Sequence, residues 1–298
     1  MELRQLEYVL AIADEGTFTR AALRLRVAQP AISQQVRRLE RELGRRLFDR
    51  SGRPVRLTPA GVAFLPFARA ALDAAADGRD AVASVEGTLT GRLRVGTVQA
   101  PPAFLPDLLG QFHEEHPGVE IAVKWEHAEE LAGHVASGAL DAAVIGRGGQ
   151  RLPAGVATRP LTSEPMVITV GRDHPLAGRS VATPAALRDQ PLVTLPAGSG
   201  LRTLVESVCV RAGFTPVIRA ETDDLFLVTE LVQHGLGIAL LPESVAKRHA
   251  NGLHLVRVRR PSLHRRLVLA WSRRQETAAG VAFRRFASTF AGSNGDSR

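Results

Sequence analysis

The stretch FTRAALRLRVAQPAISQQVRRLERELGRRL, residues 18–47, indicates how the N-terminal part of this chain folds. Its first part predicts a short amphipathic helix capped by Thr17, and its second part predicts another helix that begins at Pro30 and ends at Gly44. The apolar residues at helical spacing are Phe18, Ala21, Ala22 and Leu25 in the first helix, and Ile32, Val36, Leu39 and Leu43 in the second. Two short helices joined by a tight turn predict a helix-turn-helix.

The segments on either side of this motif complete a small predicted domain. A helix is expected over residues 3–15, where Gly16 ends it and where Leu3, Leu6, Leu10 and Ala13 share one face. After the motif, strands at residues 47–48 and 55–57 flank a turn at residues 51–54. This pattern predicts a two-stranded wing beside the helix-turn-helix.

A long helix follows the wing. Pro59 suits a first helical position, and the alanine-rich pattern continues to about Val85, with Pro66 as a point where the helix could bend. Because a lone helix this apolar has too little to pack against, we expect it to pair with a second copy of itself. Residues 87–91 then predict a hinge.

Positive charge is concentrated in the same N-terminal stretch. The 298-residue chain has a formal net charge of +8, and residues 20–56 contain eleven arginines against three acidic residues. This segment alone therefore matches the excess of the whole chain. A local excess favours a nucleic-acid surface over a general arginine bias.

The predicted recognition helix places polar and basic side chains opposite its apolar stripe. Glutamine can bond adenine, arginine can bond guanine through two hydrogen bonds, and serine can bond a base or a phosphate, whereas wing arginines suit phosphates. A solvated polar face is the ordinary alternative, but the helix-turn-helix, the proline start and the basic wing coincide here. The DNA-binding candidates are Thr17, Gln29, Pro30, Ser33, Gln34, Arg37, Arg50, Arg53 and Arg56.

From residue 92 the pattern changes to alternating strands and helices. Strands are expected at residues 93–98, 119–125, 140–146, 166–171, 191–195, 215–221, 237–242 and 267–272, with helices between most of them and a closing helix over residues 277–290. This rhythm predicts a mostly parallel, doubly wound α/β module. Two similar halves with crossovers near Pro160 and Arg265 indicate two lobes and a cleft.

The N-terminal stretch closely resembles the DNA-binding domain of LysR-type transcriptional regulators. The residues that carry the resemblance are Leu3 to Leu6, Phe18 with Ala21, Ala22 and Leu25, Gln29 to Ser33, Leu39-Glu40, Leu43-Gly44, Leu47-Phe48, Arg50, Leu57-Thr58 and Gly61. It continues more loosely through Phe112, His116-Pro117, His174 to Ala177, Gly235 to Ile238 and Leu241-Pro242. One departure is Ala28, where members often carry Ser or Thr, so the hydroxyl cap that would steady the helix beginning at Pro30, and with it the contact geometry of Gln29, is missing.

This resemblance implies a periplasmic-binding-protein-like module that holds a small effector between its lobes, in an oligomer that is a dimer of dimers. The pattern itself agrees, because ligands of doubly wound sheets sit beyond the carboxyl ends of strands and beside helix N-termini. Arg147 and Arg202, near helix starts, favour an anionic ligand. Each candidate can equally satisfy local backbone groups. The effector candidates are Thr97, Gln99, Pro101, His127, Gly146, Arg147, Ser199, Gly200, Arg202, Thr222 and Asp223.

Other classes of protein fit the sequence less well. Cys209 is the single cysteine and lies in an apolar segment, so we expect a buried structural thiol. The N-terminus is no signal peptide and no apolar run reaches membrane-span length, so we expect a cytoplasmic protein without membrane contact. Nucleophile-elbow, zinc-protease and phosphate-loop motifs are absent, so we expect neither an enzyme nor a cofactor, metal site or catalytic residue.

The predicted fold is therefore a winged helix-turn-helix, a long linker helix and a bilobed α/β module. The expected boundaries are residues 1–58, 59–90 and 91–298, with one lobe formed by residues 91–160 and 266–291 and the other by residues 161–265. The expected partners are double-stranded DNA, a small effector and further copies of the chain, as a homodimer or homotetramer. The rival hypothesis is a solute-binding module whose basic N-terminus serves only as an interaction domain.

Overall fold

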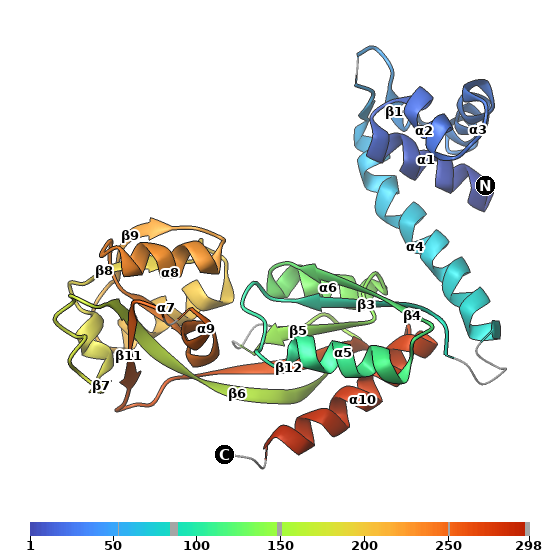
Figure 1. Ribbon diagram of the computed structural model, residues 1–298. Helices are drawn as coiled ribbons and strands as arrows, with labels where there is room; N and C mark the ends of the chain where they lie inside the picture. Colours follow the sequence, from blue (N-terminus) through green and yellow to red (C-terminus); the bar gives the residue numbers. More distant parts are fainter. Residues whose placement is uncertain (53, 84–88, 148–150, 250, 296–298) are drawn as a thin grey trace. The chain divides into compact units, whose positions relative to one another are not determined.

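The computed structural model describes residues 1–52, 54–83, 89–147, 151–249 and 251–295 (Figure 1). Its contacts divide the chain into two compact units, Met1–Glu86 and Gly87–Arg298. Each unit has its own buried apolar core, as expected for a chain of this length.

The first unit consists of four helices and one short hairpin. The elements are α1 (Leu3–Glu15), α2 (Phe18–Arg24), α3 (Gln29–Glu42), β1 (Phe48–Asp49), β2 (Arg56–Leu57) and α4 (Pro59–Ala83). The predicted cap is confirmed, because the Thr17 hydroxyl accepts a hydrogen bond of 3.1 Å from the backbone N–H of Arg20. β1 and β2 pair antiparallel, which confirms the hairpin of the wing.

The helix-turn-helix core follows the predicted stripe with two differences. Ile32, Val36 and Leu39 of α3 are fully buried, but Leu43 is 39% exposed because the helix ends at Glu42. On α1 the prediction was less accurate. The buried residues are Gln5, Leu6, Tyr8, Val9, Ala11 and Ile12, whereas Leu3 is half exposed. The buried face of α1 is thus rotated from the predicted one.

The first half of α4 belongs to the same core. Ala68 is buried, and Phe64, Leu65, Ala71 and Leu72 pack against the cluster formed by α1, α2 and α3. A Cβ atom at Gly61 would collide with the carbonyl oxygen of Leu47, so only glycine allows α4 to approach the wing this closely. The long helix is therefore not the isolated element that the sequence predicts.

The second unit is built on mixed sheets. Its strands are β3 (Gly91–Thr97), β4 (Val119–Trp125), β5 (Ala142–Gly146), β6 (Val156–Gly171), β7 (Val181–Ala182), β8 (Pro191–Thr194), β9 (Val217–Glu221), β10 (Ala239–Pro242), β11 (Leu253–Val258) and β12 (His264–Ser272). The main sheet has the order β4-β3-β5-β12-β6-β11-β7, with β10 also paired to β6, and β8-β9 form a separate pair. β12 runs antiparallel to both β5 and β6, so the sheet is mixed rather than mostly parallel.

Helices lie against these sheets in both lobes (Figure 1). They are α5 (Leu105–Glu115), α6 (Ala128–Ser137), the short 3-10 helix η2 (Pro184–Leu187), α7 (Gly200–Arg211), α8 (Leu225–Gln233), α9 (Glu243–Arg248) and α10 (Ala278–Gly295). Phe112 of α5 packs edge-on against Phe283 of α10, with ring centroids 5.3 Å apart. The C-terminal helix therefore closes the core of the first lobe.

Strand β6 joins the two lobes as one continuous element. Its first part pairs with β12 in the first lobe, and its second part pairs with β10 and β11 in the second lobe. The predicted crossovers near Pro160 and Arg265 fall within β6 and β12, and the predicted strand at residues 166–171 is only the second half of β6. The lobes are thus connected through strands rather than through loops.

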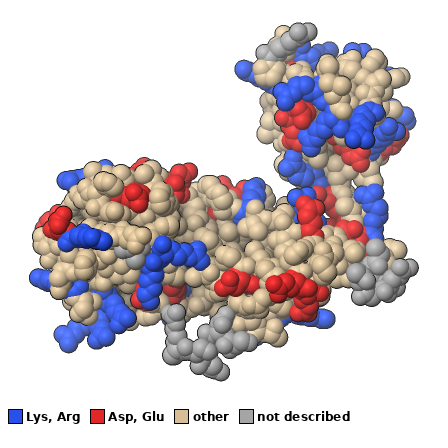
Figure 2. Space-filling model, viewed as in Figure 1, with Lys and Arg blue, Asp and Glu red and all other residues tan. Residues whose placement is uncertain are grey.

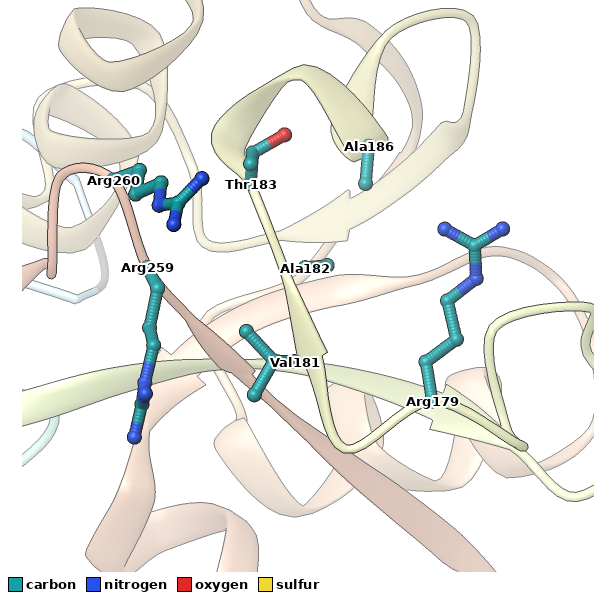
Figure 3. A pocket seen from close by; sticks show the side chains of 7 residues that line it. All are labelled: Arg179, Val181, Ala182, Thr183, Ala186, Arg259 and Arg260. Carbon is teal, nitrogen blue, oxygen red and sulfur yellow. The ribbon is translucent and has the colours of Figure 1, made fainter.

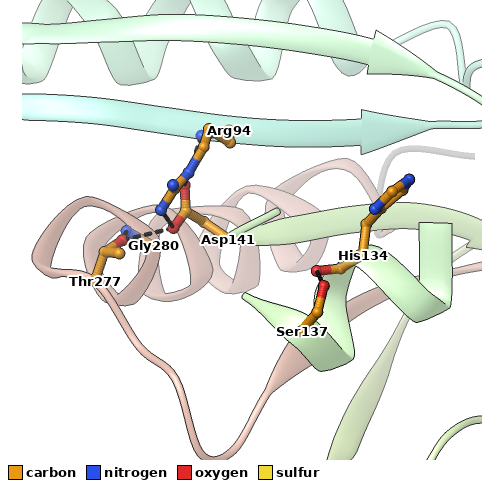
Figure 4. Close-up of polar contacts among 6 residues, drawn as sticks. All are labelled: Arg94, His134, Ser137, Asp141, Thr277 and Gly280. Atoms are coloured by element: carbon orange, nitrogen blue, oxygen red, sulfur yellow. Dashed lines mark hydrogen bonds and ion pairs between the residues drawn. The ribbon is translucent and has the colours of Figure 1, made fainter. Parts of the chain in front are cut away.

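A buried ion pair anchors the first lobe (Figure 4). The Asp141 carboxylate accepts hydrogen bonds from the backbone N–H of Arg94 at 2.6 Å and from the Thr277 hydroxyl at 2.9 Å, and it pairs with the Arg94 guanidinium at 3.1 Å. The side chains of Arg94 and Asp141 are nearly buried. Because every carboxylate oxygen has donors, this charge can be tolerated inside and holds β3 and the start of α10 to the segment before β5.

Candidate nucleic-acid interface and effector site

The exposed face of α3 borders a shallow hollow with a volume of about 840 Å³. We call the surface that lines this hollow the α3 surface. Helical geometry produces it, because residues 29, 33, 37 and 41 follow one another at intervals of four, opposite the buried stripe. The residues that line it are Gln29, Pro30, Ser33, Gln34, Arg37, Glu40, Arg41, Gly44, Arg45 and Arg46. Five of the nine predicted DNA-binding residues are therefore brought together on it.

The arginines of this unit differ in whether a carboxylate is paired with them. Several away from the α3 surface are paired with carboxylates: Arg20 with Glu15 at 3.1 Å, Arg24 with Asp14 at 3.2 Å and Arg38 with Glu2 at 3.7 Å. Among the described residues, Arg37, Arg41, Arg45 and Arg46 have no ion-pair partner. Lys and Arg are abundant on the visible face of this unit in Figure 2. The α3 surface thus carries positive charge that the protein itself does not neutralise.

Arg50 and Glu40 form a structural contact that the sequence did not reveal. The Arg50 guanidinium lies 2.9 Å from the Glu40 carboxylate and 4.6 Å from the centre of the Phe18 ring. Glu40 is buried and also accepts the backbone N–H groups of Leu47 and Phe48, at 2.9 and 3.2 Å. This arrangement ties α3 to the first strand of the wing, and it gives Arg50 a structural role beside the predicted phosphate contact.

The remaining DNA-binding candidates lie at the edges of the motif. The Thr17 hydroxyl is occupied as the cap of α2, Arg56 lies exposed on β2, and Arg53 lies outside the described residues. α3 begins at Gln29, so Pro30 is its second residue, and Ala28 occupies the cap position without a side-chain hydrogen bond. Gln29 is nevertheless part of the regular helix, which fixes its backbone direction despite the missing hydroxyl cap.

The effector candidates of the first lobe lie near the ends of its parallel strands. Thr97 is buried at the end of β3, Gln99 and Pro101 are in the following loop, and His127 precedes α6. Glu130 accepts the backbone N–H of His127 at 3.2 Å. Gly146 ends β5, and the adjoining Arg147 is exposed, with its backbone N–H bonded to the carbonyl of Arg266 at 2.8 Å.

The candidates of the second lobe are occupied by local contacts. The hydroxyl of Ser199 accepts the backbone N–H of Arg202 at 3.2 Å, where Gly200 begins α7. The Arg202 guanidinium pairs with Glu206 at 2.7 Å and with Glu221 at 3.2 Å. Two carboxylates therefore already neutralise this arginine, which weakens the sequence argument for an anionic ligand.

The start of α8 also differs from the prediction. The Thr222 hydroxyl accepts the backbone N–H of Asp224 at 3.2 Å, and it is Asp224 that caps α8, through a bond of 2.8 Å from the N–H of Phe226. Asp223 forms a contact to the other lobe through its backbone carbonyl oxygen. It accepts a hydrogen bond of 3.1 Å from the side-chain amide of Gln99 in the other lobe.

The loop at residues 99–103 is where candidates from the two lobes meet. Besides the bond from Gln99 to Asp223, the Arg248 guanidinium donates to the carbonyl of Ala103 at 2.8 Å, and that of Arg265 donates to the carbonyl of Ala100 at 2.7 Å. Arg265 is buried and pairs with Glu164 at 2.6 Å. Burial lowers the pKa of the Arg265 guanidinium, and the neighbouring Glu164 carboxylate opposes that change.

Other chemistry is weakly supported by the described residues. Cys209 is buried, and burial raises the pKa of its thiol to about 11. In the described ranges, no group of three or more His, Cys, Asp and Glu side chains is arranged to hold a metal ion. No helix within the same ranges is long and apolar enough to cross a membrane.

Comparisons with known proteins agree with this geometry. Residues 3–62 match the family model described as bacterial regulatory helix-turn-helix protein, lysR family, and residues 86–291 match the LysR substrate binding domain. The chain is 36% identical over 279 residues to the HTH-type transcriptional regulator ShiR of Corynebacterium glutamicum (strain R), covering 91% of this chain and 92% of the relative. It is 35% identical over 252 residues to a probable hydrogen peroxide-inducible genes activator of Mycobacterium avium, covering 83% and 79%.

A solved structure extends the likeness to the whole chain. The crystal structure of full-length CbnR complexed with its target DNA superposes with a TM-score of 0.77 at 25% sequence identity, covering 97% of this chain and 99% of that one. The helix-turn-helix unit and the α/β unit are therefore both those of a single family. The chain belongs to the LysR family of transcriptional regulators, with an N-terminal helix-turn-helix domain and a C-terminal substrate-binding domain.

Proposed function

We propose that this LysR-type regulator binds a specific DNA site through the α3 surface. The observation that carries this proposal is the division of the arginines. Several of those away from the surface, such as Arg20, Arg24 and Arg38, are paired with carboxylates, whereas Arg37, Arg41, Arg45 and Arg46 on it have no ion-pair partner among the described residues. Unpaired arginines beside exposed glutamines are suited to DNA, which offers both phosphates and base edges.

The side chains on this surface divide by chemistry into two roles. Gln29, Gln34 and Arg37 lie on the regular part of α3, where a side chain can reach base edges in the major groove, and Ser33 can bond a base or a phosphate. Arg41, Arg45 and Arg46 lie toward the end of α3 and beyond it, and suit phosphates. Arg53 and Arg56 of the wing would add phosphate contacts. The related CbnR was solved with its target DNA, which supports this use of the domain.

Footprinting on the promoter regions beside the gene tests the proposal. A protected sequence that survives an excess of random DNA supports specific binding, and Arg37→Ala should weaken the protection. A wild-type chain that protects no sequence would favour the rival hypothesis, a solute-binding module whose basic N-terminus is a non-DNA interaction domain. Turnover of a ligand retained by the purified protein would instead support an enzyme, whereas we propose that the chain acts only as a regulator, in the cytoplasm where its DNA lies.

We further propose that the effector binds where the two lobes meet at the loop of residues 99–103. Gln99 of that loop and Asp223 of the other lobe are already within hydrogen-bond distance, so a ligand held there would contact both lobes at once. Arg147 is exposed and has no ion pair with any described residue, whereas Arg202 is neutralised by two glutamates. An anionic effector would therefore depend on Arg147 rather than on Arg202.

The sequence does not favour a thiol-based signal, although one relative is a probable hydrogen peroxide-inducible activator. Cys209 is the only cysteine, so a disulfide within the chain cannot form. With a pKa of about 11, only roughly one thiol in ten thousand is ionised at neutral pH, and the thiolate is the form that reacts. We propose that this regulator responds to a bound ligand and not to oxidation of Cys209.

Two exposed apolar regions support an oligomer. On α4, Phe67 is 74% exposed and Val82 is 73% exposed, which suits pairing with a second copy. In the second unit, the exposed Val123 and Trp125 lie on the edge strand β4. Two separate surfaces are what a dimer of dimers requires, and we propose that assembly with α4 forming the first interface.

Sedimentation of point variants tests the α4 interface better than a deletion, because deletion of α4 would also remove Ala68 and its neighbours from the core. Phe67→Glu should convert the dimer formed through α4 into smaller species, while Val123→Glu should leave that dimer intact. If Phe67→Glu sediments like the wild type, the main interface lies elsewhere.

A further inference from the structure

A second basic surface lies on the lobe that holds β7 and β11. A hollow of about 520 Å³ at this place is lined by Arg179, Val181, Ala182, Thr183, Ala186, Arg259 and Arg260 (Figure 3). None of these residues belongs to the α3 surface or to the effector candidates. In Figure 3, Arg179 lies on one side of β7, while Arg259 and Arg260 lie on the other.

Strand alternation explains why Arg259 faces outward. β7 and β11 pair in parallel, with Val258 opposite Ala182, and both of these side chains are buried. Their chain neighbours Val181 and Arg259 are exposed, since successive residues of a strand point to opposite faces. Val181 thus provides an apolar surface on the edge strand, and Arg259 places a guanidinium beside it.

The charge of the hollow is not neutralised by the protein. Its lining includes three arginines and no carboxylate, and none of the three has an ion pair with any described residue. The neighbouring Arg188 behaves differently, because it donates to the carbonyl of Ala212 at 3.1 Å and stacks on Phe214 at 4.9 Å. Residues 244–275 contain nine lysines and arginines without one acidic residue. This segment, which includes Arg259 and Arg260, therefore supplies no counter-charge.

We propose that this hollow binds a small phosphate compound that carries at least two negative charges. Guanidinium groups bond phosphate oxygens through paired, charge-assisted hydrogen bonds, and the exposed Thr183 hydroxyl adds a further donor. Three arginines exceed what a single carboxylate would neutralise, and Val181 and Ala186 offer apolar contact to the rest of the ligand. The volume of the hollow lies within the ordinary range of small-molecule pockets, which is roughly 300–1,000 Å³.

A DNA backbone is the competing occupant, and the geometry favours it less. Phosphates of a duplex recur along a line, and a protein that follows them presents a stripe of cations. Here the arginines lie on both sides of a two-residue edge strand and surround a local hollow. The proposed site is also independent of the effector site, since it shares no residue with the loop at residues 99–103.

Isothermal titration with inorganic pyrophosphate tests the proposal on the full-length chain. The titration is run at about 0.15 M salt, so that weak surface attraction is screened. The wild type should bind one pyrophosphate per chain, and Arg179→Ala and Arg260→Ala should each weaken binding about tenfold or more. Arg211→Ala is the matched control, because Arg211 is exposed on the same lobe and has no ion pair with a described residue, and it should bind like the wild type.

Three results would overturn the site. The wild type could fail to bind pyrophosphate saturably, or all three variants could lose affinity equally, which would indicate attraction to net charge alone. Alternatively, Arg179→Ala and Arg260→Ala could reduce affinity for DNA while pyrophosphate does not bind, which would assign the surface to nucleic acid. Unchanged thermal unfolding of the variants shows that they are folded, and reduced hydrogen exchange at residues 179–187 on addition of pyrophosphate provides a second measurement in support.

Discussion

The predicted DNA-binding surface on α3 and the predicted effector site at α7 both contain arginines, but the surroundings of their guanidinium groups differ completely. Arg37, Arg41, Arg45 and Arg46 have no carboxylate partner among the described residues, whereas Arg202 contacts Glu206 at 2.7 Å and Glu221 at 3.2 Å. The positive charge of the first group is therefore available to a partner molecule. Arg202 is mostly buried and links α7 to β9 within the protein.

An arginine is available to a ligand only if the fold leaves its guanidinium without a carboxylate partner. Arg50 illustrates an intermediate case, since it was predicted to grip a phosphate but lies between Glu40 and Phe18. Its guanidinium is partly exposed and still accessible, but its main effect in this structure is to hold the wing to α3. The consequences of these differences can be ranked by experiment.

The largest effect is expected from the buried carboxylate behind the α3 surface. Glu40→Ala leaves the backbone N–H groups of Leu47 and Phe48 and the Arg50 guanidinium without their acceptor. Removal of one member of a buried ion pair costs about 3–5 kcal/mol, so the first unit should unfold far more readily. Hydrogen exchange of α1–α3 in the full-length chain measures this change. Glu42→Ala is the control, because Glu42 is exposed and, among the described residues, its one ion pair is with the N-terminal ammonium. Equal exchange in both variants would contradict the assigned network.

The next effect concerns sequence preference. Arg37→Ala should weaken binding to the preferred site by about 1–3 kcal/mol and relax the preference at one base position. Arg24→Ala removes the same charge but breaks an exposed pair with Asp14, so its effect should be much smaller. Fluorescence anisotropy with specific and random duplexes measures both. A loss that is equal on all sequences would move Arg37 from base contact to phosphate contact.

A smaller effect is expected at the end of α3. Arg41→Ala should weaken binding to every sequence alike and reduce the slope of log affinity against log salt by about one unit. The wing residue Arg53 should behave in the same way. Arg38→Ala, which removes an arginine paired with Glu2, should leave the slope nearly unchanged. A change of base preference in Arg41→Ala or Arg53→Ala would show that these residues read sequence.

The smallest effect is expected at Arg202. Thermal stabilisation by a panel of small carboxylates should be lost in Arg147→Ala and retained in Arg202→Ala, because two glutamates already occupy the Arg202 guanidinium. The same panel applied to the wild type gives the reference shift. If Arg202→Ala loses the response and Arg147→Ala keeps it, the effector displaces the glutamates. A carboxylate partner would then not prevent Arg202 from binding a ligand.

Elements with strong local signals were predicted correctly from the sequence. Thr17 caps α2 as expected, and Ile32, Val36 and Leu39 are buried, because the apolar stripe of a helix needs only the helical repeat. Glu40 was counted only as a charge, although it is the buried acceptor that organises the wing. Its three partners lie up to ten residues away, and helical spacing gives no information about them.

Strand β6 shows why other elements were missed. Residues 156–165 include Pro160 and Pro165 among polar residues, and proline removes a backbone donor that a strand needs. The structure accommodates this with an irregularity, since the register of β12 shifts between Leu267 and Val268, opposite Pro160. A strand formed around a bulge is decided by its partner, and that partner lies about a hundred residues later in the chain.

The basic surface at β7 and β11 was missed for a different reason. The net positive charge of residues 20–56 equals that of the whole chain, so the net charge of the remaining residues is zero. The net charge therefore does not reveal the basic segment at residues 244–275. Only the pairing of β7 with β11 brings Arg179, Arg259 and Arg260 around one hollow.

By itself the sequence determined the helix-turn-helix, the linker helix, the α/β character of the second unit and the family, because local periodicity, caps and motifs are properties of neighbouring residues. The tertiary structure alone decided which charges are available. Arg37 is unpaired and Arg202 is paired because ion pairs act over about 4 Å in space, and residues as distant in sequence as Arg202 and Glu221 meet only after the chain has folded.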